Sequence, residues 1–211
     1  MNTNYLKTII TAIALMLSLS ANAYDFEVDG IYYNVLSMTD LTCSVTSGDN
    51  KYSGNVIIPE KATYAGMTFA VTSIGNYAFY GCTGLTSVTI GNSVTSIGDK
   101  AFYYCEGLRD IYVNWQNPLT NIGTGVFIGV DKTDCTLHVP VGTLSKYKSA
   151  DVWKSFGEIK EWDAVGIENI AKDSQLQPTM NGSIIDFSGQ RVTNPVKGQM
   201  YIINGKKVYY R

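Results

Sequence analysis

A tandem repeat of 23 residues constrains the fold of this chain more than any other feature of its sequence. Residues 71–93, VTSIGNYAFYGCTGLTSVTIGNS, are followed without a gap by residues 94–116, VTSIGDKAFYYCEGLRDIYVNWQ. Eleven of the 23 positions are identical, and most of these are apolar or glycine. A period of roughly 20–50 residues indicates a solenoid, in which each coil packs only on its neighbours and the inward positions must recur.

One half of each unit predicts a half-buried strand. Apolar and polar residues alternate in LTSVTI at residues 85–90 and in LRDIYV at residues 108–113. Alternation places the apolar side chains on one face and the polar side chains on the other. The strand half alone recurs upstream at residues 55–59, and an insertion at residues 60–70 predicts a hairpin. We therefore predict a short stack of coils, as follows: a partial repeat at 52–70 and full repeats at 71–93, 94–118 and 119–139.

The other half of each unit predicts the corner that closes the coil. The pattern I-G-x-x-A-F-x-x-C begins at Ile74 and again at Ile97. The spacing of Ala, Phe and Cys predicts one short helical turn, and the glycine predicts a bend of the chain. Because inward positions stack, Phe79, Phe102 and Phe127 are expected to form one buried ladder.

The segments on either side of the repeats predict caps, because an open coil would expose its core. Residues 24–48 predict a hairpin in which Asp29 and Gly30 form the two-residue turn. In the second cap, at residues 140–163, Thr143 is expected to cap a short helix. Large apolar side chains then form a lid: Trp153, Phe156, Ile159 and Trp162.

The two tandem units resemble the BspA-type leucine-rich repeats of bacterial surface proteins, which are common in the Bacteroidales. The flanks NVIIPE at residues 55–60 and VPVGT at residues 139–143 resemble that family as well. The resemblance spans residues 24–162. It implies a β-rich α/β repeat solenoid, that is, a short leucine-rich-repeat stack with N- and C-terminal caps. It also implies an exported protein with an adhesive or binding role.

The N-terminus predicts export. Lys7 is the only charged residue in residues 1–23, an apolar run follows it, and Ala21 and Ala23 form the small-residue pattern that signal peptidase cleaves after. The run is shorter than a membrane span requires. We predict a signal peptide at 1–23, a mature chain from Tyr24 without a transmembrane segment, and an outer-membrane surface or extracellular location, with the periplasm as an alternative.

The C-terminal part predicts a second β unit. Residues 164–180 have scattered apolar residues and are interpreted as a linker. Residues 183–187, 200–203 and 206–210 predict strands, and Asn204 with Gly205 is a strong hairpin signal. The 181–211 module is similar to the sorting domains of type IX secretion, and a small β module without a role in export is an equally supported interpretation.

The four cysteines, Cys43, Cys82, Cys105 and Cys135, do not indicate catalysis or a metal centre. Cys82 and Cys105 occupy equivalent positions, and the third repeat has Val130 there, so the position is apolar and a buried free thiol is favoured over a disulfide. His138 is the only histidine, and the chain has no CxxC pair, phosphate-binding loop or nucleophile elbow. We therefore predict that the protein is not an enzyme and that it binds no metal and no cofactor.

The net charge of −2, which becomes −3 without Lys7, disfavours nucleic acid as a partner. The favoured hypothesis is a non-catalytic binding or adhesion module for a protein or glycan on host or neighbouring cells. Two alternatives remain: a scaffold for a surface-polymer hydrolase, and a structural secreted protein without a strong ligand.

The outward strand positions predict where a partner binds. Aligning the repeats places Ile57, Thr89, Tyr112 and His138 in one row and Asn55, Ser87, Asp110 and Thr136 in a second. Solenoids commonly bind along such a concave sheet. Tyr112 is the strongest candidate because a large amphipathic ring binds with little loss of entropy. The candidate binding residues are Tyr112, His138, Thr89, Asp110, Ser87 and Thr136.

Overall fold

The computed structural model describes residues 24–162, 184–185, 199–203 and 206–210. The chain divides into two compact units, Met1–Trp162 and Asp163–Arg211. The predicted signal peptide lies outside the described residues. In the described part of the chain, no helix has both the length and the apolar character needed to cross a membrane.

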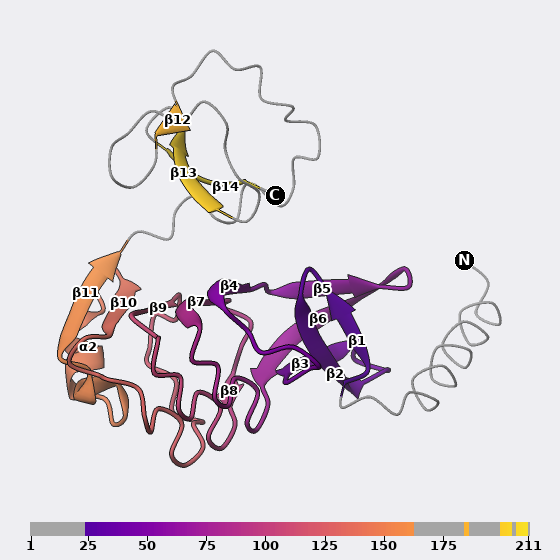
Figure 1. Cartoon of the computed structure of the whole chain (residues 1–211), viewed down its shortest axis with the longest axis horizontal. Coiled ribbons are helices and arrows are strands. Elements are labelled where there is room, and N and C mark those ends of the chain that lie inside the picture. The colour runs from indigo at the N-terminus through magenta and orange to yellow at the C-terminus, as the bar shows by residue number, and fades with distance from the viewer. Residues whose placement is uncertain (1–23, 163–183, 186–198, 204–205, 211) are drawn as a thin grey trace. The chain divides into compact units, whose positions relative to one another are not determined.

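The repeats build a parallel sheet of five strands in the order β11-β10-β9-β7-β4 (Figure 1). The strands are β4 (Gly54–Ile58), β7 (Leu85–Ile90), β9 (Asp110–Val113), β10 (Thr136–Pro140) and β11 (Glu158–Trp162). Inward residues pair in register from coil to coil, so that Val88 lies beside Ile111 and Ile111 beside Leu137. All three are buried, and the predicted β-rich solenoid is confirmed.

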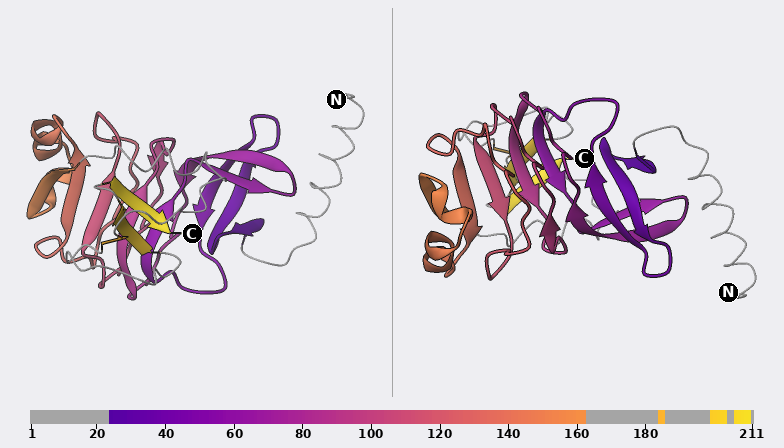
Figure 2. Two further views of the ribbon diagram at one scale, coloured as in Figure 1. Left: turned by 90° about the horizontal axis from the view of Figure 1, so that it is seen from above. Right: turned by 90° about the horizontal axis from the view of Figure 1, so that it is seen from below.

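A second sheet forms the N-terminal cap and runs into the coils (Figure 2). Its strands are β1 (Phe26–Val28), β2 (Ile31–Ser37), β3 (Thr42–Thr46), β5 (Lys61–Tyr64), β6 (Met67–Ile74) and β8 (Ser96–Ile97). Asp29 and Gly30 have φ values of 52° and 78°, as a type I′ turn requires, and the predicted β1–β2 hairpin is confirmed. The predicted insertion hairpin is also confirmed, with β5 and β6 antiparallel.

The phenylalanine ladder fills the centre of the coils. The rings of Phe79 and Phe102 are stacked at 4.8 Å, and those of Phe102 and Phe127 at 5.5 Å. All three side chains are buried. Tyr52 from the N-terminal side and Trp153 from the C-terminal side extend the ladder at its two ends. The repeat register inferred from the sequence is therefore confirmed in the core.

The corners are successive turns, and the predicted helical turn is wrong. In the first coil, the backbone N–H groups of Tyr77, Phe79 and Gly81 donate to carbonyl groups of the next coil. The N–H groups between them, of Ala78 and Tyr80, close local turns instead. Alternate amides are thus committed to the neighbouring coil, which prevents the i to i−4 bonding of an α-helix.

The corner glycines are required by close approach of the coils, and their predicted role in bending stays a prediction. Neither Gly75 nor Gly98 has a positive φ. A Cβ on Gly98 would lie 2.6 Å from the backbone nitrogen of Asn76 in the preceding coil, and one on Gly75 would lie 3.0 Å from the carbonyl oxygen of Val45. These distances are too short for a carbon atom, so a side chain at either position would force the coils apart.

The C-terminal cap closes the stack as predicted, except at Thr143 and at Trp162, which lies on the outward face of the sheet and not in the lid. The short helix α2 (Leu144–Ser149) buries Tyr147, and the 3-10 turn η1 (Trp153–Ser155) buries Trp153. Thr143 precedes α2, but its hydroxyl donates to the carbonyl of Pro140 at 2.6 Å and accepts no helix N–H. The predicted side-chain cap is therefore wrong, because the hydroxyl is used to close the turn after β10.

The C-terminal unit contains three antiparallel strands. They are β12 (Ile184–Ile185), β13 (Gln199–Ile203) and β14 (Lys206–Tyr210), in the order β12-β13-β14. The pairing of Ile203 with Lys206 places the hairpin at the predicted Asn204–Gly205 position, although these two residues lie outside the described part. The predicted linker also lies outside it, and the sorting role stays a prediction.

Candidate functional site

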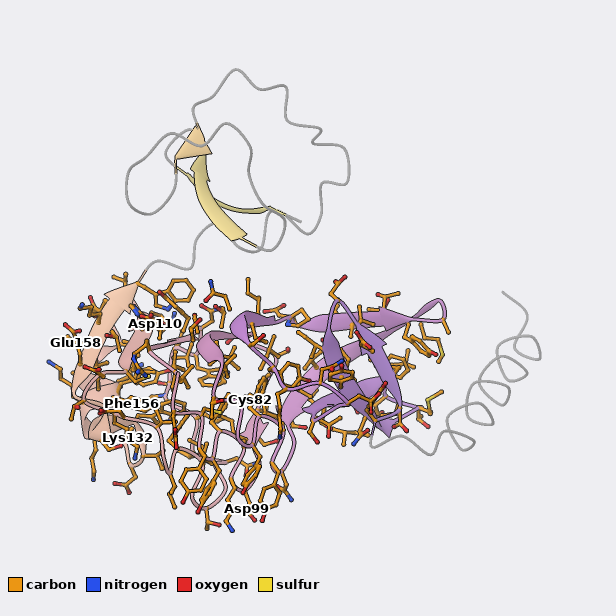
Figure 3. The ribbon with its side chains drawn as sticks, in the orientation of Figure 1. Cys82, Asp99, Asp110, Lys132, Phe156 and Glu158 are labelled. Carbon is orange, nitrogen blue, oxygen red and sulfur yellow. The ribbon has the colours of Figure 1, made fainter. Side chains whose placement is uncertain are left out.

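The outward face of the parallel sheet carries the two predicted rows in register. Thr89 pairs with Tyr112, and Tyr112 with His138. The second row is also in register, and it runs through Asn55, Ser87, Asp110 and Thr136. Strand β11 extends both rows with Glu158 and Lys160, which the repeat alignment did not reach. Asp110 and Glu158 lie together on this side of the coils (Figure 3).

Three aromatic rings form a cluster on this face, which we call the aromatic cluster: Tyr112, His138 and Trp162. The rings of Tyr112 and His138 are stacked at 4.1 Å with an interplanar angle of 9°. Trp162 meets Tyr112 edge-on at 4.9 Å, and its Nε1 donates to the Val113 carbonyl at 3.0 Å. Because β9, β10 and β11 each contribute one ring, the parallel sheet holds the cluster in place.

Asp110 fixes the position of His138. The Nε2 atom of His138 lies 2.7 Å from the Asp110 Oδ1 atom, which makes this contact an ion pair whenever the imidazole is protonated. Burial, together with the charge of Asp110, raises the pKa of Tyr112, so its phenol stays neutral and can donate a hydrogen bond. The aromatic cluster therefore offers a phenol donor, with the Asp110 carboxylate beside it.

The adjacent strand edge is polar. The Thr136 hydroxyl donates to Glu158 Oε2 at 3.1 Å, and Lys160 Nζ lies 2.9 Å from Glu158 Oε1. The hydrogen bond from Lys160 lowers the pKa of the Glu158 carboxyl, which is therefore ionised at neutral pH. Both side chains are exposed, so this pair offers charge to a partner and adds little to stability.

The described residues of this face form neither a nucleophile–base pair nor a metal site. Among the described residues, no Ser, Thr or Cys side chain hydrogen-bonds His138, as a nucleophile and its base would. The described part of the chain also holds no cluster of three or more His, Cys, Asp or Glu side chains that could bind a metal ion. What the face presents is an ordered set of rings, hydroxyls and carboxylates.

The sequence placed most of this site correctly and missed Trp162. Tyr112, His138, Thr89, Asp110, Ser87 and Thr136 all lie on the predicted rows, and their role in binding stays a prediction. Trp162 was assigned to the lid over the core. Its position two residues beyond Lys160, on the same alternating face as Glu158, is the signal that could have placed it beside Tyr112.

All four cysteines are buried free thiols, which confirms the prediction for Cys82 and Cys105 and decides the state of Cys43 and Cys135, which the sequence left open. Cys105 Sγ donates to the Phe79 carbonyl of the preceding coil at 2.9 Å. Burial raises the pKa of Cys43, Cys105 and Cys135 to about 12 and raises that of Cys82 as well. They are therefore packed side chains of the core.

A family comparison points to the same architecture. Residues 59–148 match the family described as the BspA type Leucine rich repeat region, with six copies of its repeat. The fold is a β-rich repeat solenoid, and the matched residues lie within its coils and the segments beside them. The matched residues include β7, β9 and β10, and thus two of the three rings of the aromatic cluster. A search of the curated proteins finds no match.

Three solved structures are similar to part of the chain. A leucine-rich repeat protein from Bacteroides ovatus is 25% identical over 65% of this chain and 41% of that chain, with a TM-score of 0.43. One from Bacteroides capillosus is 24% identical over 68% and 100%, with a TM-score of 0.49. A leucine rich cell surface protein from Faecalibacterium prausnitzii is 20% identical over 66% and 43%, with a TM-score of 0.41. This chain thus covers less than half the length of the first and third proteins.

Proposed function

We propose that this protein is an exported, non-catalytic binding module that recognises a protein or glycan through the outward face of its parallel sheet. The observation that carries the proposal is the aromatic cluster, in which Tyr112 is stacked on His138 and braced by Trp162. A ring held in place before binding loses little entropy when a partner docks. The match of residues 59–148 to a leucine-rich repeat family supports a binding role.

Tyr112 is expected to contribute most of the affinity. Its ring is half-buried between His138 and Trp162, and partly buried tyrosines often act as binding hot spots. The residue that pairs with Tyr112 on strand β7 is Thr89. Because the threonine side chain is short, it leaves that side of the Tyr112 ring uncovered by a large side chain. Asp110 and Glu158 add acceptors for polar groups of the partner.

A ligand screen followed by a matched pair of variants tests the proposal. The protein would be screened against host matrix proteins and glycans, and the affinity of each hit measured for Tyr112→Ala. We expect at least tenfold weaker binding, about 1.4 kcal/mol. The control is Tyr77→Ala, which removes an exposed ring from a corner of the coils. Because Tyr112 also packs on two rings, both variants would be measured well below their unfolding temperatures.

Equal binding by the wild type and Tyr112→Ala would place the site elsewhere, and a loss of binding in both variants would point to a general effect on the fold. Export is tested separately by N-terminal sequencing of the protein recovered from its native host. We expect the mature chain to begin at Tyr24, since the small-residue pattern ends at Ala23. An intact Met1 on the exported protein would contradict the signal-peptide prediction.

A further inference from the structure

A groove of about 460 Å³ runs along the corners of the coils, away from the aromatic cluster. It is lined by strand β3, by the end of β6, by β8 and by the following coil, so that four successive layers of the stack contribute to it. Asp99, which lines the groove, lies at a different edge of the coils from Asp110 and Glu158 (Figure 3). The volume falls within the usual range for ligand sites.

A column of serine hydroxyls lines this groove without hydrogen-bond partners. Ser44 is in register with Ser73, and Ser73 with Ser96, on adjacent parallel strands. Within residues 24–162, none of the three hydroxyls makes a hydrogen bond, although Ser44 is only 6% exposed. The Ser44 hydroxyl reaches solvent through the groove, so all three hydroxyls can bind water there or the hydroxyl groups of a ligand.

The neighbouring amide and carboxylate groups provide further hydrogen-bond donors and acceptors for a ligand. Asn76 Oδ1 accepts the Asp99 N–H at 2.8 Å, and Asp99 Oδ1 accepts the Thr124 N–H at 2.6 Å. These bonds hold both side chains in place and leave the Asn76 Nδ2 group and the Asp99 Oδ2 atom unpaired among the described residues. Asn121 lines the far end of the groove and adds another amide.

The backbone N–H groups along the groove already form hydrogen bonds within the stack. A ligand would therefore be recognised by the side chains. The N–H groups of Gly75, Gly98 and Gly123 donate to the preceding layers at 2.7–2.8 Å. An extended peptide that bound by adding a strand would need free N–H groups, and those of the three glycines are already engaged. A polyhydroxylated ligand needs only hydroxyl and amide partners, and the groove supplies a set of them in each layer.

The charge of the groove selects among such ligands. Asp99 is the only charged residue in its lining. Hydrogen bonds from the Thr124 N–H and hydroxyl groups lower the pKa of the Asp99 carboxyl, which therefore stays negative at neutral pH. A fixed negative charge without a cation in the lining disfavours sulfated, phosphorylated or uronic-acid ligands.

We propose that this groove binds a neutral, linear oligosaccharide that lies along the solenoid axis. Successive layers are about 4.8 Å apart, as in any sheet, so that the serine column presents a hydroxyl at each step of an extended sugar chain. Leu36, which is 55% exposed, supplies an apolar surface at the N-terminal end for a sugar ring face. This site is independent of the aromatic cluster and of any partner bound there.

Isothermal titration of the full chain with neutral hexasaccharides of glucose, xylose, mannose and galactose tests the proposal, with a galacturonic-acid hexasaccharide as the acidic counterpart. We expect at least one neutral hexasaccharide to bind and the acidic one not to bind. The double variant Ser73→Val with Ser96→Val removes two hydroxyls, and valine suits a strand. It should weaken binding at least tenfold.

Thr42→Val is the matched control, because Thr42 is a partly buried residue of β3 that does not line the groove, and Tyr112→Ala separates binding in the groove from binding at the aromatic cluster. Both should bind the sugar like the wild type. A second readout does not depend on the double variant folding: amide chemical shifts of the wild type should move at Gly75, Gly98 and Gly123. Absence of binding to every neutral hexasaccharide, preference for the acidic one, or loss of binding in either control but not in the double variant would overturn the proposal.

Discussion

The strand side and the corner side of each coil are held together differently. On the strand side, β4, β7, β9, β10 and β11 pair as ordinary parallel strands, and any outward side chain is compatible with the pairing. On the corner side, only alternate amides reach the next coil, and the intervening residues turn the chain. The corner positions therefore accept fewer residue types than the outward strand positions do.

Two positions of each corner adopt a left-handed backbone. The first is Tyr77, Lys100 and Gly125 in successive coils, with φ values of 57°, 53° and 65°. The second is Gly81, Tyr104 and Gly129, with φ values of 64°, 56° and 84°. Left-handed backbone is costly for residues with a Cβ. Within the five parallel strands, the single such position among the described residues is Gly54, at the start of β4, with a φ of 65°. The outward rows have none, so their residue types are less restricted by the backbone.

The largest expected change in stability follows the loss of the Phe102 ring, which stacks on the rings of the two neighbouring coils. Phe102→Ala should destabilise the protein by about 3–5 kcal/mol, because the ring is fully buried and stacked on both Phe79 and Phe127. Urea unfolding monitored by circular dichroism measures the change. Thr89→Ala on the strand surface is the control, and it should stay within about 0.5 kcal/mol of the wild type. Similar stabilities for the two variants would contradict the register of the coils.

The next effect tests close approach at the corner. Gly98→Ala should cost about 1–3 kcal/mol, because a Cβ would lie 2.6 Å from the Asn76 nitrogen and the coils would have to move apart. Gly84→Ala is the control, since its Cβ would meet only the exposed Ser53 side chain, at 3.2 Å. Thermal unfolding of the two variants separates the two cases. An equal loss in both would mean that backbone entropy, and not coil contact, determines the need for glycine.

A third variant isolates the backbone conformation from steric contact. Gly81 has a φ of 64°, and a Cβ there would meet no atom within 4 Å. Gly81→Ala should therefore cost about 1–2 kcal/mol through the left-handed conformation alone. Gly81→Asn is the comparison, because asparagine tolerates this conformation better than alanine does. An alanine variant that is more stable than the asparagine variant would contradict this explanation.

The strand side could be predicted from the sequence, and the corner side only in part. Alternation fixed the register of Val88 with Ile111 and of Thr89 with Tyr112, because period-two patterning leaves one choice of buried face. The corner spacing resembled a helix, but the hydrogen bonds that decide its conformation join different coils, and no local pattern reports them. The glycines at 81, 125 and 129 were the available signal for left-handed positions.

The candidate site shows the same division between local and distant information. The rows follow from alternation, so Tyr112 and Asp110 were placed correctly. The contact between Asp110 and His138 crosses from one row to the other and depends on side-chain rotamers, which spacing does not determine. The hydrogen bond from Trp162 to Val113 joins residues 49 apart in the chain. The groove along the corners is lined by residues of the N-terminal cap and of the coils, so local spacing does not report it either.

The smallest expected effect concerns the cysteine position of the corner, which accepts Val130 in the third coil. Cys82→Val should change the stability by less than about 1.5 kcal/mol, because the equivalent position of the third coil holds a valine and the swap keeps the apolar character. In the native protein, iodoacetamide at pH 8 should modify none of the four cysteines, since burial blocks access and raises the pKa of Cys105 to about 12, so that almost no thiolate forms. After denaturation without reductant, mass spectrometry should find all four alkylated. A peptide pair linked through Cys82 and Cys105 would show that these corner positions are joined covalently, and rapid native alkylation would show that the corner opens to solvent while the strand side stays paired.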